Sequence, residues 1–255
     1  MKPLRILYIL LPLSLLASLW VLSKNINLSA KINNKTQQLS QTIDRVVETA
    51  TPKPTIIEKN GLPNAHLIKT AFIQQAPEKN WDLPWQDTCE EASLLTLDFY
   101  YKNQSPSLTD QKQAILNMLD FETSQNYPID INISQMAIVA SNYLHLTPKI
   151  IDNPTLDQIK QSIAANIPVI VPANGKILFA QNSHFKSGGP WYHNIVILGY
   201  DDLRQEFIVH DVGTQFGAYF HYSYGLLMNA IHDFPASLTK EDINSGTPRI
   251  LILLK

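Results

Sequence analysis

The sequence is poor in cysteine and in charge, and each shortage excludes a class of protein. The single cysteine, Cys89, excludes an intramolecular disulfide framework and a zinc site built from several thiolates. Charged side chains make up 16% of the 255 residues, with 20 basic against 22 acidic ones. This near-neutral balance removes the general electrostatic case for nucleic-acid binding. The 45% of hydrophobic residues excludes a disordered chain.

Part of that hydrophobicity lies in an N-terminal run. Lys2 and Arg5 precede residues 6–22, which carry no charge. A positive start followed by such a run is typical of a signal peptide or a membrane anchor. The run is longer than the roughly 7–15 apolar residues of a signal peptide, and no Ala-x-Ala-like site follows it. We therefore expect residues 1–22 to form an uncleaved signal-anchor helix, with a cleaved signal peptide and a secreted protein as the alternative.

The rest of the chain divides into a stalk and a folded domain. Residues 23–64 are expected to form a polar stalk, rich in Asn, Gln, Ser and Lys and interrupted by proline and glycine. Residues 65–255, roughly 190 in number, suit one domain. We expect this domain outside the cytoplasm, because a short N-terminal tail is more easily kept inside than a large folding domain. Charge counting alone does not decide this orientation, since lysines also follow the run.

Within the folded domain, helix-like segments come first and strand-like segments second. Asp87 and Glu90 have capping-box spacing at the start of the first helix. This order predicts an α+β fold in which N-terminal helices pack on a C-terminal antiparallel sheet. The expected elements are a short strand at 67–73, helices at 89–101, 108–119, 133–143 and 156–166, and strands at 168–172, 192–200, 206–211, 218–222 and 250–254.

Cys89 is the first candidate for chemistry. A lone cysteine beside an apolar helix is more often an inert small hydrophobe than a nucleophile. Its place at a helix start, however, favours a thiolate, although Glu90 and Glu91 act against this. Gln86, three residues earlier, is either an ordinary solvated loop residue or a donor to an oxyanion forming beside Cys89.

His193 and Asp211 supply a base and an acid that can meet in space. Their midpoint falls in a turn-like stretch at 201–204, so a hairpin makes them neighbours to within a register step. The carboxylate can then orient the imidazole while the other ring nitrogen faces the thiol. His210 should point to the opposite face. The remaining histidines lack a comparably placed acid and thiol or look structural, and none has metal-ligand spacing: His66, His145, His184, His221 and His232.

Several segments together resemble the papain-like, bacteriocin-processing cysteine peptidases (peptidase C39-like) and their stand-alone bacterial relatives. The first half contributes Gln75-Ala76-Pro77, Asn80-Trp81-Asp82 and LPWQDTCEEAS at 83–93. The second half contributes VIVPANGK at 169–176, GGPWYHNIVILGYDD at 188–202 and FIVHDVGTQFG at 207–217. The resemblance spans residues 67–234, nearly the whole folded domain.

This resemblance implies a papain-like fold and a role for each candidate residue. Cys89 matches the nucleophile, His193 the general base, Asp211 the orienting acid and Gln86 the oxyanion-hole glutamine. The sequence departs from the family at Val212, where proline is usual. No transporter segments accompany the domain, so cleavage of double-glycine leader peptides is not implied.

Glycine is also scarce, and seven of the nine glycines lie between Gly175 and Gly225. Gly188 and Gly189 precede His193, so their loop is either one wall of a substrate cleft or a plain turn. Trp191 is a candidate for the same cleft, although such an aromatic is at least as often part of a core. We therefore expect substrate contacts from Gly188, Gly189 and Trp191.

The expected function is that of a membrane-anchored thiol hydrolase acting on a peptide or another amide, with no cofactor, metal or nucleic acid involved. A catalytically inactive peptide-binding module on a membrane stalk is the alternative from a different class. Acyl transfer to an amine would use the same residues and cannot be separated from hydrolysis by sequence.

Overall fold

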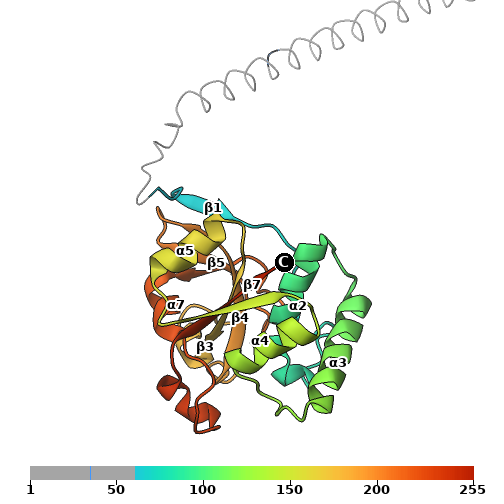
Figure 1. Cartoon of the computed structure of the whole chain (residues 1–255). Coiled ribbons are helices and arrows are strands. Elements are labelled where there is room, and N and C mark those ends of the chain that lie inside the picture. Colours follow the sequence, from blue (N-terminus) through green and yellow to red (C-terminus); the bar gives the residue numbers. More distant parts are fainter. Residues whose placement is uncertain (1–34, 36–60) are drawn as a thin grey trace, which may run out of the picture. The chain divides into compact units, whose positions relative to one another are not determined.

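The computed structural model describes Lys35 and residues 61–255 of the chain (Figure 1). The expected anchor at 1–22 and nearly all of the expected stalk lie outside the described residues. Within the part that is described, no helix is both long enough and apolar enough to span a membrane.

Seven strands form one sheet in the described residues, and all their pairings are antiparallel. Its order is β2-β7-β3-β4-β5-β6. Strand β4 is central, because β3 pairs with its first half and β1 with its second half on the same side. The strands are β1 (Ala65–Leu67), β2 (Thr147–Asp152), β3 (Val169–Ala173), β4 (His193–Asp201), β5 (Glu206–His210), β6 (Phe220–Ser223) and β7 (Arg249–Leu254).

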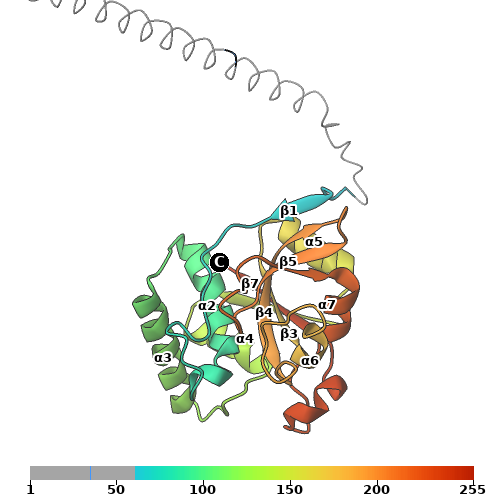
Figure 2. The ribbon, with the colours of Figure 1, turned by 180° about the vertical axis from the view of Figure 1, so that it is seen from behind.

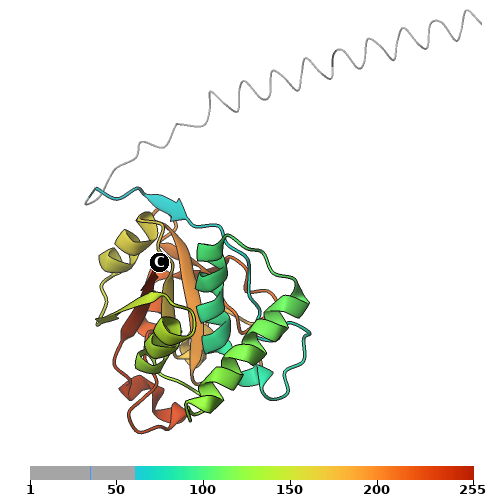
Figure 3. The ribbon, with the colours of Figure 1, turned by 45° about the vertical axis from the view of Figure 1, so that its right-hand side comes forward.

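Helices flank this sheet. Figures 1 and 2 show α2, α3 and α4 grouped on one side and α5 and α7 on the other, and the turned view in Figure 3 shows α2 lying along the sheet. The predicted α+β class is therefore confirmed. The helices are α2 (Cys89–Lys102), α3 (Leu108–Ser124), α4 (Ile133–Asn142), α5 (Leu156–Ala164), α6 (Gly175–Leu178) and α7 (Tyr224–Ala230), with 3-10 turns η1 (Trp85–Asp87) and η2 (Lys240–Ser245).

Capping side chains explain where three of these helices begin. In α3, α4 and α5 the residue before the helix accepts a bond from the third helical N–H, and the third side chain bonds back to the cap. These reciprocal bonds satisfy donors that the first helical turn leaves open. The pairs are Ser107 with Asp110, Asn132 with Gln135, and Thr155 with Gln158.

The capping box predicted for the first helix is wrong. Thr88 occupies the cap of α2 and its side chain makes no capping bond. The Thr88 hydroxyl instead donates to the carbonyl oxygen of Gln75 at 3.0 Å, and the Glu90 side chain turns into the protein. Packing of the preceding loop against the helix start has displaced the local capping pattern.

The strand prediction is wrong at two places. The first strand ends at Leu67 and does not continue to residue 73, because β4 offers it pairing partners only over Gly199–Asp201. Strand β2 was not predicted, since Thr147-Pro148-Lys149 carries proline and a charge. It lies at the sheet edge, where proline is tolerated.

Strand β4 is buried on both faces. Eight consecutive residues, from His193 to Tyr200, are buried, which explains why this segment has an almost continuous apolar run. Tyr200, Phe207 and Tyr222 are among the largest fully buried side chains, so the core continues into β5 and β6.

A bulge sets the register between β4 and β5. Near the turn, Tyr200 pairs with Phe207, and continuing that register would bring Asp211 opposite Val196. The shift between Ile197 and Gly199 instead pairs Val196 with His210, which aligns Asp211 with Ile195. Because side chains alternate along a strand, this one-residue shift brings Asp211 to the face that carries His193.

A buried ion pair holds the turn of this hairpin. Lys160 of α5 donates to both carboxylate oxygens of Asp202, at 2.8 and 2.6 Å. The hydroxyl of Tyr224 in α7 donates to the same carboxylate at 2.8 Å. Two helices, α5 and α7, are thereby tied to the turn between β4 and β5.

We expect Lys160→Met to destabilise the protein by about 2–4 kcal/mol, because it leaves the Asp202 carboxylate without its buried partner. Urea unfolding of the full-length protein measures this change. Arg204→Met is the matched control, since Arg204 contacts Asp201 of the same turn at 3.7 Å but is largely exposed. It should cost less than about 1 kcal/mol. Equal losses in the two variants would contradict the role assigned to Lys160.

Candidate active site

Cys89 is the first residue of α2 and is buried, with 4% of its surface exposed. Its Sγ donates to Glu90 Oε2 at 2.9 Å, and the side-chain amide of Asn194 donates to Sγ at 3.8 Å. No hydrogen bond links Sγ with the His193 ring in the described part of the chain. The thiol therefore rests against Glu90 and Asn194.

The surroundings of this thiol oppose its ionisation. Burial raises the pKa of Cys89 well above its usual value, and the Glu90 carboxyl raises it further, while a hydrogen bond from Asn194 acts in the other direction. In this resting arrangement the nucleophile candidate is a neutral thiol.

His193 and Asp211 form the second part of the site. His193 begins β4 and Asp211 directly follows β5. His193 Nε2 lies 2.8 Å from Asp211 Oδ1, and both side chains are buried. The hairpin thus brings together the two residues that sequence spacing paired, although Asp211 aligns with Ile195, two residues from the expected position opposite His193.

Three further donors bind the Asp211 carboxylate. Tyr222 Oη and Asn182 Nδ2 donate to Oδ2 at 2.6 and 2.9 Å, and the backbone N–H of Gly213 donates to Oδ1 at 3.2 Å. Burial alone would raise the pKa of Asp211, but His193, Tyr222 and Asn182 together bring it below its usual value. The carboxylate is therefore held charged.

Sequence reasoning missed Tyr222 and Asn182. Tyr222 lies in β6 and Asn182 in the loop after α6, so neither is near Asp211 in a local pattern. Alternation along 218–222 could have assigned Tyr222 to a buried face, but not to a particular carboxylate.

Gly213 and Gly217 leave room for the His193–Asp211 pair. A side chain at Gly213 would come within 2.5 Å of the His193 ring, and one at Gly217 would collide with the Asp211 carbonyl oxygen. Only glycine lets the loop after β5 pack this closely. The loop therefore fixes the imidazole from one side.

Cys89 and His193 line one cleft, with a volume of about 460 Å³. Gln86, exposed on η1, and Gly189 line it too. Asp211 is fully buried behind His193. The remaining lining residues are Gln75, Trp81, His184, Phe185, Lys186, Ser187, Pro190, Tyr192, Gly213, Thr214, Gln215 and Phe216.

Gly188 and Trp191 do not belong to that lining. Trp191 is 39% exposed, and Lys176 Nζ lies 5.0 Å from the centre of its ring. Of the three residues expected to contact substrate, the structure brings only Gly189 to the cleft wall. There, Gly189 adopts a positive φ of 83° and packs against the Gly175 carbonyl oxygen, so it has no space for a side chain.

The other histidines have separate surroundings. His210 is buried between the rings of Phe72 and Tyr219, and burial lowers its pKa to about 3. It is absent from the cleft lining, as expected from strand alternation. His184 does line the cleft, which its sequence position did not indicate, and it stacks on Phe216 with ring centres 4.4 Å apart.

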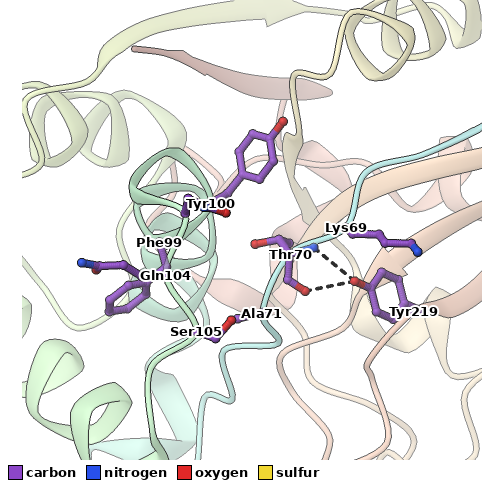
Figure 4. A pocket seen from close by; sticks show the side chains of 9 residues that line it. Lys69, Thr70, Ala71, Phe99, Tyr100, Gln104, Ser105 and Tyr219 are labelled. Carbon is purple, nitrogen blue, oxygen red and sulfur yellow. Dashed lines mark hydrogen bonds between the residues drawn. The ribbon is translucent and has the colours of Figure 1, made fainter.

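A second hollow, of about 290 Å³, lies between the segment after β1, the end of α2 and Tyr219 (Figure 4). The Tyr219 hydroxyl accepts from the Thr70 N–H and donates to the Thr70 carbonyl oxygen. This hollow contains none of the predicted site residues. Over the described residues, no cluster of three or more metal-ligating side chains occurs either.

The arrangement has the parts that thiol-based acyl chemistry needs. A cysteine at a helix start, a histidine oriented by a buried carboxylate and a side-chain amide meet around one cleft. In the described residues the thiol itself bonds Glu90 and Asn194 and not the histidine.

Comparisons with known proteins identify the family of the chain. A family model described as "Peptidase_C39 like family" matches residues 68–232. Among solved structures, a protein assigned as a C39-like peptidase from Bacillus anthracis is 13% identical, with a TM-score of 0.46, over 75% of this chain and 98% of its own. Xylellain, a cysteine protease from Xylella fastidiosa, is 13% identical, with a TM-score of 0.39, over 80% of this chain and 90% of its own. No curated protein sequence matches the chain. Because the family model covers well over half of its length, the chain belongs to the Peptidase_C39 like family and is, at that level, a cysteine peptidase.

Proposed function

We propose that the protein hydrolyses peptide or other amide bonds with a Cys89–His193–Asp211 triad. The observation that carries this proposal is the buried His193–Asp211 pair, whose histidine lines one cleft together with a cysteine at a helix start. Membership of the peptidase family supports the same activity. Cys89 and His193 line the same cleft as the exposed Gln86, so an amide bound there would lie next to both reacting residues.

In the proposed reaction His193 is the proton carrier. Its Nε2 is bonded to Asp211, which leaves Nδ1 to take the Cys89 proton once the thiol turns towards it. The thiolate then attacks the carbonyl carbon. Gln86 and the Cys89 backbone N–H donate to the oxyanion that forms. The C–N bond breaks as His193 protonates the leaving amine.

Water completes the reaction. His193 takes a proton from the water, the resulting hydroxide attacks the thioester, and the C–S bond breaks to release the acid and the thiol. An amine in place of water would give acyl transfer with the same residues. A peptide-binding module without catalysis is favoured by one observation only, the contact of the thiol with Glu90.

Peptide cleavage by the full-length protein tests the triad. We expect new peptide termini, detected by mass spectrometry after incubation with an unbiased peptide mixture. Cys89→Ala should abolish them, and His193→Ala should lower the rate by at least about a hundredfold, the usual contribution of a general base. Cleavage that survives Cys89→Ala would disprove the proposal, and binding without cleavage by the wild type would favour the inactive module.

Gln86 provides a separate arm of this experiment. Gln86→Ala should lower kcat by about a hundredfold with little change in KM, because an oxyanion donor acts in the transition state. Gln113→Ala is the control, since Gln113 is exposed on α3 and bonds only Asn117 among the described residues. An unchanged kcat in the Gln86 variant would show that Gln86 is an ordinary solvated loop residue and not an oxyanion donor.

Tyr222→Phe tests how the carboxylate is held. The folded-state pKa of Asp211 lies below its usual value, so the pair stabilises the fold above the unfolded pKa. That stabilisation is lost as the pH falls through the folded pKa. Removing the Tyr222 donor should raise that pKa and move the loss to higher pH.

Unfolding midpoints measured across acidic pH record this shift, and kcat/KM should fall about tenfold because a bond to a charged group is lost. Tyr219→Phe is the matched control, since the Tyr219 hydroxyl bonds Thr70 and not Asp211. Identical pH profiles in the wild type and the Tyr222 variant would contradict the assignment.

We also propose that residues 1–22 anchor the protein in the cell membrane, with residues 65–255 outside the cytoplasm on a stalk. Lys2 and Arg5 before the charge-free run 6–22 support this. We expect the full-length protein in the membrane pellet after carbonate washing, and its domain accessible to protease added outside the cell. A shortened protein in the soluble fraction would instead indicate a cleaved signal peptide.

A further inference from the structure

Glu90 has an unusual place for an acidic residue in the first turn of a helix. It is fully buried and makes no capping bond. Its Oε2 accepts from Cys89 Sγ at 2.9 Å, and its Oε1 accepts from the backbone N–H of Ile131 at 3.3 Å. Both oxygens act as acceptors, so the carboxyl group draws the thiol hydrogen towards itself.

Asn194 holds the thiol from the other side. Its Nδ2 lies 3.8 Å from Sγ. Asn194 follows His193 in β4, and successive side chains of a strand point to opposite faces. The thiol thus rests against the residue that points away from the imidazole side of the strand.

We propose that Glu90 is a positioning residue that holds the Cys89 thiol in a resting orientation, which the thiol must leave before His193 takes its proton. This inference rests on the proposed function, because it concerns the same nucleophile. In this proposal a rotation of the thiol about the Cα–Cβ bond of Cys89 separates the resting state from the reactive one.

The groups around Glu90 raise its affinity for a proton, which makes it a better acceptor for the thiol hydrogen. Burial raises the pKa of Glu90 well above its usual value, and the Asp130 and Glu122 carboxyls act in the same direction. On the same helix Glu91 is buried too. The buried Tyr192 hydroxyl donates to the Ile131 carbonyl oxygen. Burial raises the pKa of Tyr192, and the Glu90 carboxyl raises it further.

Lys240 is a cationic side chain next to the acidic residues around Glu90. Its Nζ lies 3.2 Å from Asp130 and 3.7 Å from Asp87, and it is 43% exposed. Lys240 therefore offsets the charge of the Asp130 and Asp87 carboxylates. It makes no bond with Glu90 or with the thiol. A thiolate at Cys89 would face an acidic environment on this side, whereas on turning to His193 it would gain an imidazolium partner.

Glu90→Gln separates positioning from simple packing. The substitution keeps the shape, and its amide can donate to sulfur where the carboxyl group only accepted. We expect alkylation of Cys89 by iodoacetamide to become on the order of tenfold faster near neutral pH, because a lower thiol pKa raises the thiolate fraction. The acid limb of the pH–rate profile should move to lower pH.

Glu91→Gln is the matched control. Glu91 has the same charge and burial, but its carboxyl oxygens make no bond with the thiol. We expect wild-type alkylation rates in this variant. A Glu90→Gln protein that is alkylated no faster than the wild type, or only as fast as Glu91→Gln, would overturn the inference.

Infrared spectroscopy gives a second readout that does not require the variant to fold. The full-length chain has one thiol, so its S–H stretching band reports on Cys89 alone. In the wild type the band should lie at lower frequency than in the urea-unfolded protein, because the thiol donates a strong hydrogen bond. Equal frequencies in the two states would contradict the contact with Glu90.

The two hypotheses fail in different ways. If the triad is wrong, Cys89→Ala leaves peptide cleavage intact, whatever the alkylation rates are. If Glu90 is not a positioning residue, cleavage still depends on Cys89 and His193, but Glu90→Gln changes neither the alkylation rate nor the S–H band.

Discussion

The hydrogen bond between His193 and Asp211 is the interaction on which the site depends. It joins two side chains with almost no exposure to water, so the charge of the carboxylate must be balanced within the protein. Tyr222, Asn182 and the Gly213 N–H supply that balance. Without these donors burial would favour a neutral acid, which could neither orient the imidazole nor stabilise its charged form.

This bond in turn depends on strand register. A hairpin without the bulge at 197–199 would direct Asp211 to the wrong face of the sheet. Gly199 allows the bulge region to meet β1, since a side chain there would come within 2.7 Å of the His66 carbonyl oxygen. The Lys160–Asp202 pair then holds the turn. Residues far from the cleft therefore decide which side chains meet in it.

Sequence was informative where chemistry and local spacing coincide. The positions of His193 and Asp211 around a turn predicted their meeting, and the spacing of three residues placed Gln86 in the loop that leads to Cys89. The midpoint of 193 and 211 missed the register by two residues, because Asp211 aligns with Ile195, and the one-residue bulge leaves no distinct pattern in an apolar run. Long-range partners such as Tyr222 come from another strand, and no local rule specifies them. The inward turn of Glu90 was missed because its spacing fits a helix cap equally well.

The buried carboxyl groups of Asp211 and Glu90 have opposite environments. Four donors surround Asp211 and hold it charged. Glu90 receives one backbone N–H and the thiol hydrogen, and neighbouring carboxyls push its pKa upward. When the surroundings of two acidic residues drive their pKa values apart, one residue serves as the proton donor and the other stays ionised. Here the division concerns one thiol: towards Glu90 it keeps its proton, and towards His193 it can lose it. Burial and Glu90 thus act against the helix start that favours a thiolate, and under our proposal the site becomes reactive when the side chain of Cys89 turns to His193.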